Sequence, residues 1–256
     1  MGAGTRSSTD RRPTREELAR RRHRLEETVA PLAGCSLLHT ILLPLVPILT
    51  VVLVMTVGIA VHQGSDPGWP DWALLVPLGA AYVAVVAGLY WRWDRVTWRA
   101  AAVVRTPTLR ELGIATLATA VGIGIVVAGN VAATAVGLDP HARAPVTSTA
   151  GIAALVLTSI VIAPVAEEIL FRGLVLGHFL ARGYGVVTAS VLSIALFALV
   201  HVFMTGAVSI AITGALGVVL TALRLWYDSL VAPWVIHLLV NAWGLTLTIG
   251  LMPIPW

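Results

Sequence analysis

Charged residues are scarce in this sequence, and lysine is absent from it. Only 12% of the 256 residues are charged, all 17 basic residues are Arg, and 57% of the residues are hydrophobic. A soluble domain carries about 25% charged residues, so this composition excludes an ordinary soluble protein and indicates a membrane protein. The lack of Lys beside abundant Ala and Val is typical of a GC-rich bacterial genome, so we expect a multi-pass protein of a bacterial cell membrane.

Cysteine is nearly absent as well. The single Cys35 excludes an internal disulfide and is too isolated to build a thiolate metal site. Residues 1–35 are too long and too charged for an ordinary signal peptide, and we interpret them as a polar, Arg-rich cytoplasmic arm. The Arg residues flank apolar runs, where they orient a chain in the bilayer, so we expect the lipid bilayer and no nucleic acid as a partner.

Long apolar runs dominate the rest of the chain. A transmembrane helix needs about 20 mainly apolar residues, and the sequence predicts seven such helices in an all-α, polytopic helical bundle. The predicted spans are residues 37–61, 72–91, 112–136, 147–180, 186–203, 207–225 and 230–252. The fourth run is longer than one span and contains Pro164, which predicts a tilted or kinked helix.

The placement of Arg predicts the orientation. Eight Arg residues precede the first span, five more lie in residues 92–110, and Arg182 and Arg224 end later spans, whereas the intervening loops hold only Arg143. Basic residues mark cytoplasmic loops, so we expect a cytoplasmic N-terminus. Residues 92–110 fit an amphipathic strip on the membrane surface or a plain basic loop.

We therefore divide the chain after its N-terminal arm into two membrane regions. Residues 36–146 form N-terminal transmembrane helices, and residues 147–252 form a transmembrane core that carries the chemistry. The division follows the ionisable residues, because the first three spans are nearly free of them. A charge in the bilayer interior costs at least about 2.5 to 3.5 kcal/mol, so each one needs a reason.

Two adjacent glutamates in the fourth span predict different roles for neighbouring residues. On a helix Glu167 and Glu168 point about 100° apart. Glu168 and Arg172 are spaced i, i+4 with the acid first, which favours an ion pair. Glu167 has no such partner, so desolvation can make it a general base.

The fifth and seventh spans add further polar residues. Phe197 and His201 lie in the fifth, and His237 and Asn241 are spaced i, i+4 on one face of the seventh. Two imidazoles, a lone carboxylate and an amide on three spans can activate water. Each residue taken singly also fits a plain hydrogen bond between helices.

These residues resemble the motifs of the CAAX protease and bacteriocin-processing family, which includes the Rce1-type enzymes. The resemblance covers about residues 163–243, and three short motifs occur there in the family's order. They are EExxxR at Glu167, Glu168 and Arg172, FxxxH at Phe197 and His201, and HxxxN at His237 and Asn241.

The resemblance implies an intramembrane endopeptidase that acts on a membrane-associated protein or peptide. Glu167 and His201 would activate water, and His237 and Asn241 would stabilise the oxyanion. Glu168, Arg172 and Phe197 would support them. The mechanism requires no cofactor, although Glu167, His201 and His237 could also supply three ligands to a catalytic zinc.

The motifs of other kinds of intramembrane protease are missing from the spans. The spans contain no HExxH, no GxGD aspartate pair and no GxSxG serine. Two non-enzymatic alternatives stay open: a catalytically silent scaffold or bacteriocin-immunity protein, and a transporter that uses buried Glu and His as a relay. A transporter is typically built from inverted repeats, which the sequence does not show.

Overall fold

The structure is a computed structural model that describes residues 14–62, 68–138, 146–202 and 206–255. Helices form its secondary structure, and the described residues contain no strand. Phe203 and Arg143, on which two of the predictions rest, lie outside the described residues. The all-α helical bundle predicted from the sequence is confirmed.

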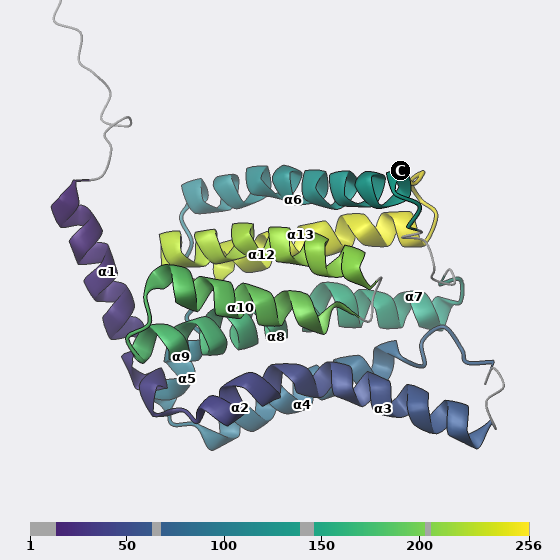
Figure 1. Ribbon diagram of the computed structural model, residues 1–256, viewed down its shortest axis with the longest axis horizontal. Helices are drawn as coiled ribbons and strands as arrows, with labels where there is room; N and C mark the ends of the chain where they lie inside the picture. Colours follow the sequence, from purple (N-terminus) through teal and green to yellow (C-terminus); the bar gives the residue numbers. More distant parts are fainter. Residues whose placement is uncertain (1–13, 63–67, 139–145, 203–205, 256) are drawn as a thin grey trace, which may run out of the picture.

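The longer helices run side by side along the length of the molecule, and α1 crosses one end of the bundle at a steep angle (Figure 1). The first half of the chain contains α1 (Arg15–Val29), η2 (Ala30–Gly34), α2 (Leu37–Leu42), η3 (Leu43–Leu45), α3 (Val46–Val61), α4 (Leu75–Arg92), α5 (Arg95–Ala101) and α6 (Leu109–Ala135). The second half contains α7 (Thr149–Leu155), η4 (Val156–Ile162), α8 (Ala163–Glu167), η5 (Glu168–Val175), α9 (Leu176–Ala181), α10 (Val186–Val200), α12 (Ala207–Tyr227) and α13 (Val231–Thr248).

Six of the seven predicted spans are helices long and apolar enough to cross a membrane, counted among the described residues. The fifth prediction corresponds to α10, which has 15 residues. At 1.5 Å per residue it is about 22 Å long, short of a bilayer core of about 30 Å. In the described part of the chain, the seven predicted spans therefore correspond to six helices of spanning length and one shorter apolar helix.

The fourth span is one continuous helical rod, Thr149–Ala181, with two π-helical segments. In the first, η4, the amide of Ala163 donates to the carbonyl of Thr158, five residues back. Pro164 follows directly, and its ring clashes with the carbonyl four residues before it in an ordinary α-helix. The wider π-turn accommodates that ring, so the expected distortion at Pro164 is present.

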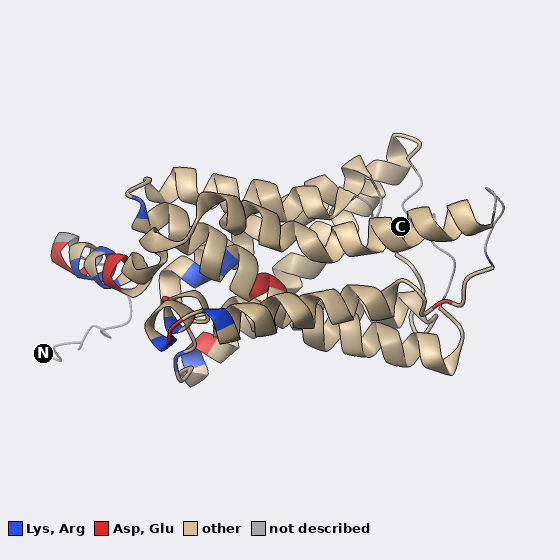
Figure 2. Ribbon diagram, turned by 90° about the horizontal axis from the view of Figure 1, so that it is seen from below, with Lys and Arg blue, Asp and Glu red and all other residues tan. Residues whose placement is uncertain are grey.

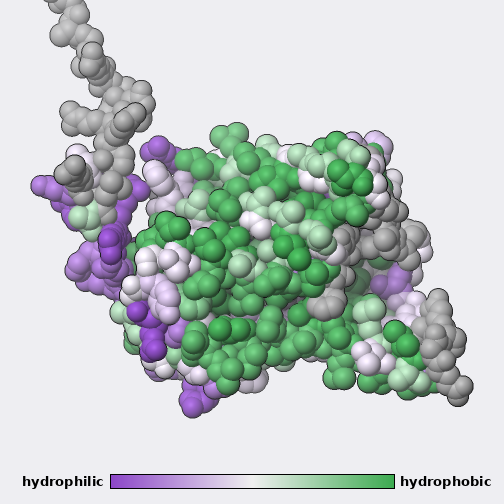
Figure 3. Space-filling model, viewed as in Figure 1, coloured by the Kyte–Doolittle hydropathy of each residue, from purple (hydrophilic) through white to green (hydrophobic). Residues whose placement is uncertain are grey.

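The outer surface of the bundle is apolar along its flank. Green hydrophobic residues cover the side in Figure 3, and hydrophilic residues gather at the end that carries α1. Acidic and basic residues also gather at that end in Figure 2. A mid-bundle apolar surface with a basic end is the pattern of a helical protein in a bilayer, while the cytoplasmic N-terminus itself stays a prediction.

The helices of the two predicted membrane regions pack as one bundle. The long helix α6 lies against α12 and α13, and α4 lies against α7, η4 and α8. Gly79 on α4 leaves room for the side chain of Thr158, whose hydroxyl donates to the carbonyl of Leu75 at 3.0 Å. Helix α4 is thereby held against the rod that carries the glutamates.

Part of the N-terminal arm is folded onto the bundle. Thr14 and Glu17 form a capping box that starts α1, and Leu25, Val29 and Leu32 are buried beside α5 and α9. His178 of α9 is buried, and its Nδ1 lies 3.0 Å from the carbonyl oxygen of Leu32. This histidine ties the arm to the rod.

A second link joins the arm to the start of α13. The carboxylate of Asp228 contacts the guanidinium of Arg105, accepts a hydrogen bond from Thr28 at 3.0 Å, and pairs with the buried Arg224 at 2.9 Å. Ser229 accepts from the amide of Val231 at 3.2 Å. We call Thr28, Arg105, Arg224 and Asp228 the α1-end cluster.

Candidate active site

Glu167 ends α8 in the interior of the bundle, and its side chain is only 7% exposed. One carboxylate oxygen, Oε1, accepts a hydrogen bond of 2.5 Å from the hydroxyl of Tyr82 on α4. No donor among the described residues reaches the other oxygen, Oε2. This oxygen faces Nε2 of His237 at 3.5 Å and Nε2 of His201 at 3.9 Å. Three of the four residues to which the sequence analysis assigned catalysis therefore lie together, and the fourth, Asn241, is described below.

His237 of α13 lies between the two adjacent glutamates. Its Nδ1 is 2.9 Å from Oε1 of Glu168, while its Nε2 points at Glu167. A carboxylate can only accept, so Nδ1 of His237 is the donor to Glu168. Glu167 and Glu168 do point in different directions, as expected, but both directions lead to the same imidazole.

His201 follows the last residue of α10 and is the most accessible of the three, with 13% of its side chain exposed. Its Nδ1 donates to the carbonyl of Phe197 at 2.7 Å, which leaves Nε2 as the acceptor that faces Glu167. Ser209 of α12 donates to the carbonyl of His201 at 2.5 Å. The backbone and the ring orientation of His201 are thus both held.

Glu168, Arg172 and Phe197 form a fully buried support below the histidines. Arg172 pairs with Glu168 at 3.1 Å with side chains 0% and 1% exposed, which confirms the predicted i, i+4 ion pair. The guanidinium lies 4.0 Å over the ring of Phe197. The same ring packs edge-on against His201 and His237. The cation is therefore placed by an acid and an aromatic face together.

Asn241 lies one helical turn beyond His237 and is half-buried. Its Nδ2 donates to the backbone carbonyl of Ser159 at 2.8 Å. The contact joins α13 to η4, and an amide nitrogen carries a second N–H beside the one used here. Asn241 is near the cluster along its helix but binds the rod instead of a glutamate or a histidine.

Three atoms of the cluster are candidate zinc ligands, namely Oε2 of Glu167 and Nε2 of both His201 and His237. Tetrahedral ligand atoms about 2.0 Å from zinc lie roughly 3.3 Å apart, whereas Oε2 of Glu167 is 3.5 and 3.9 Å from the Nε2 atoms of His237 and His201. Across the described part of the chain, no group of three His, Cys, Asp or Glu side chains is arranged to hold a metal ion.

Sequence reasoning missed two contacts of the site. Tyr82 lies in an otherwise apolar span, and nothing in its spacing connects it with Glu167, 85 residues later. One indication of a role for Tyr82 was present in the sequence, which is that a buried phenol usually needs a hydrogen-bond partner. The contact between Glu168 and His237 was missed because Glu168 already had Arg172 as a partner in its own helix.

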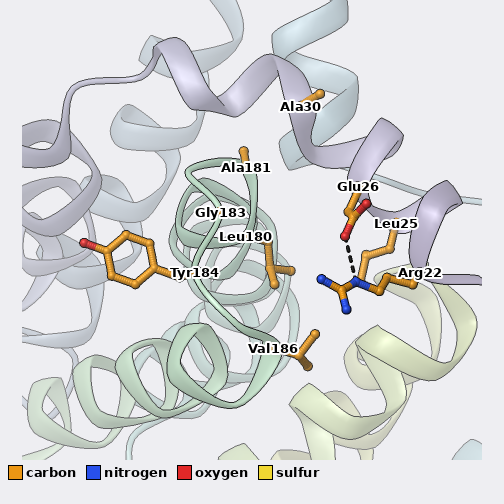
Figure 4. A pocket seen from close by; sticks show the side chains of 9 residues that line it. All are labelled: Arg22, Leu25, Glu26, Ala30, Leu180, Ala181, Gly183, Tyr184 and Val186. Atoms are coloured by element: carbon orange, nitrogen blue, oxygen red, sulfur yellow. Dashed lines mark hydrogen bonds and ion pairs between the residues drawn. The ribbon is translucent and has the colours of Figure 1, made fainter. Parts of the chain in front are cut away.

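Two cavities open to the surface away from this cluster. A cavity of about 260 Å³ separates α1 from the turn between α9 and α10, and Arg22 and Glu26 form an ion pair of 2.8 Å on its wall (Figure 4). A groove of about 600 Å³ lies between α2 and α4 and reaches Leu174 of η5. Neither is lined by Glu167, His201 or His237.

Comparison with known proteins agrees with the geometry. Residues 149–243 match the family model described as type II CAAX prenyl endopeptidase Rce1-like. No curated protein and no solved structure matches the chain at the significance required. The matched region contains every site residue predicted from the sequence, and it contains the buried cluster of Glu167, His201 and His237 described above. Residues 149–243 are thus similar to the Rce1-like family of type II CAAX prenyl endopeptidases, which supports the family resemblance carried by the three motifs.

Proposed function

We propose that this membrane protein is an intramembrane endopeptidase that hydrolyses a peptide bond of a membrane-associated protein or peptide with a glutamate-activated water. One observation carries the proposal. Oε2 of Glu167 is a buried carboxylate oxygen to which no residue that the structure describes donates, and it faces imidazole nitrogens of His201 and His237. Buried polar atoms are almost always paired, so an unpaired carboxylate oxygen in a histidine cluster favours a proton-accepting role.

Water activation is assigned to Glu167 and His201. The distance of 3.9 Å between Oε2 and Nε2 is too long for a direct hydrogen bond and suits one bridging water. Such a water donates one proton towards each atom, because Nε2 of His201 is an acceptor. Glu167 then removes one proton, and the oxygen that remains attacks the carbonyl carbon of the substrate.

Stabilisation of the oxyanion is assigned to His237 and Asn241. His237 uses Nδ1 for Glu168, so it donates from Nε2 when the ring carries both protons. Asn241 uses one N–H for Ser159 and has a second for the substrate oxygen. Donors aimed at a developing charge in a water-poor interior stabilise it strongly.

The second half of the reaction returns the site to its starting state. The carbon–nitrogen bond breaks as the proton held by Glu167 passes to the leaving nitrogen. The products are a new carboxylic acid and a new amine, the proton of the acid then passes to the amine to give a carboxylate and an ammonium group, and Glu167 is again ionised. Arg172 stays paired with Glu168 throughout, so the proton that moves belongs to Glu167.

The test is hydrolysis by the purified protein in liposomes. Membrane-anchored peptides, with and without a C-terminal prenylated cysteine, are incubated in ¹⁸O-labelled water and analysed by mass spectrometry. We expect two fragments, with ¹⁸O in the new carboxyl group. Intact peptides across the whole panel would favour the silent scaffold instead. Cleavage that survives a zinc chelator supports the glutamate mechanism, and cleavage that stops and returns with added zinc contradicts it.

A further inference from the structure

Tyr82 reaches the site from outside the region that matches the family model. It lies on α4, whereas the match begins at residue 149. The residue is 5% exposed, and its hydroxyl donates to Oε1 of Glu167 at 2.5 Å. Contacts one turn away, between Gly79, Leu75 and Thr158, hold α4 at this depth. The packing of α4 against η4 therefore holds Tyr82 in position for this hydrogen bond.

This bond makes the two oxygens of Glu167 different. A free carboxylate turns about its last torsion and presents either oxygen, because that torsion is roughly two-fold. Here Oε1 is held by the phenol of Tyr82, and Oε2 is left towards His201 and His237. Since a buried carboxylate keeps its charge only with donors nearby, the phenol also affects how readily Glu167 is ionised.

We propose that Tyr82 is a positioning residue that selects Oε2 of Glu167 as the proton-accepting oxygen and supports its ionised form. The proposal rests on the protease function proposed above. If it is correct, α4 contributes a residue to the active site, and residues 149–243 alone do not contain the whole site. The competing explanation is that Tyr82 only satisfies its own buried hydroxyl.

The test is Tyr82→Phe in the full-length protein, which removes the hydroxyl and keeps the ring. A hydrogen bond to a charged group is lost, so we expect kcat to fall by about 10- to 100-fold with KM unchanged. The acidic limb of the pH–rate profile moves to higher pH, because the carboxylate has lost its donor. Loss of packing alone would change the melting temperature and leave the acidic limb where it is.

Tyr90→Phe is the matched control. Tyr90 lies on the same helix, is 58% exposed and packs its ring edge-on against Trp98. Its substitution should leave kcat, KM and the pH profile at wild-type values. A fall in activity as large as that of Tyr82→Phe would assign the effect to α4 in general and overturn the proposal.

Replacement of Tyr82 by 3-fluorotyrosine keeps the shape and makes the hydroxyl a stronger donor. We expect the acidic limb to move to lower pH, opposite to the phenylalanine variant, and this test stands even if Tyr82→Phe does not fold. An unchanged acidic limb in a folded variant overturns the proposal while wild-type cleavage keeps the protease function. Absence of cleavage by the wild type overturns both.

Discussion

Two Arg–carboxylate pairs at i, i+4 spacing lie in two regions of this bundle, and their carboxylates have different surroundings. In the α1-end cluster both oxygens of Asp228 have partners, from Arg224 on one side and from Thr28 and Arg105 on the other. In the site, Oε1 of Glu168 accepts hydrogen bonds, whereas no described residue donates to its Oε2. The same holds for the Oε2 of Glu167.

The two environments suit different roles. The carboxylate of Asp228 holds helices together, whereas Glu167 keeps an oxygen that could accept a proton. A carboxylate with both oxygens paired holds helices together and gains nothing from a proton. A buried oxygen without a donor is costly, and it persists where the fold compensates for it. In this molecule we attribute the offsetting stabilisation to Arg172, which contacts both Phe197 and Glu168.

Arg172→Leu should have the largest effect on stability. It leaves Glu168 as a buried charge without its cation, which costs about 3 to 5 kcal/mol. The measurement is thermal unfolding in detergent, and we expect a large fall in melting temperature together with loss of cleavage. The double variant Glu168→Leu/Arg172→Leu should recover most of the stability, because an apolar pair can replace a buried ion pair. A wild-type melting temperature for Arg172→Leu would refute the supporting role.

Asp228→Asn should have a smaller effect and one confined to stability. Asp228 has a left-handed backbone with φ of 47°, which Asn tolerates well, so the change removes charge without adding strain. Loss of the charged partner of Arg224 costs about 1 to 3 kcal/mol. We expect the melting temperature to fall while kcat, measured where the variant is folded, stays at the wild-type value. A selective loss of kcat would place this cluster in the catalytic machinery.

Asp71→Asn should have the smallest effect, and that effect depends on pH. The hydroxyl and the amide of Ser148 donate to Asp71 at the start of α7, and they lower the pKa of this carboxyl below its ordinary value of 3.8. A lowered pKa in the folded state contributes stability above the ordinary value and loses it as the pH falls through the folded value. The wild type should melt slightly higher than Asp71→Asn at pH 7, and the two should converge below about pH 4. An equal difference at both pH values would contradict the assignment.

The sequence predicted the polar residues of the site because charges in apolar runs are conspicuous. Glu167, His201 and His237 stand out within their spans, and the Glu168–Arg172 pair follows from helical spacing alone. The short length of α10 was not predicted, because its apolar pattern continues towards residues that follow the helix end at His201.

Contacts between helices that are far apart in the sequence could not be predicted from the sequence. The pairing of Tyr82 with Glu167 depends on how α4 packs against α8, which no local pattern encodes. The π-helical form of η4 and η5 was likewise not predicted, although Pro164 indicated a distortion of this helix. Asn241 shows the reverse case, since its spacing from His237 was read correctly and its partner, the carbonyl of Ser159, was not.

The most direct test of the central claim is the cleavage rate of Glu167→Gln in liposomes, at a temperature where variant and wild type are equally folded. Glutamine keeps the size of the side chain and an acceptor for Tyr82, but it cannot take a proton from water. We expect cleavage to fall by about 100- to 10,000-fold, the contribution of a general base, with an unchanged melting temperature. Cleavage at the wild-type rate would contradict the assignment of Glu167 as the base.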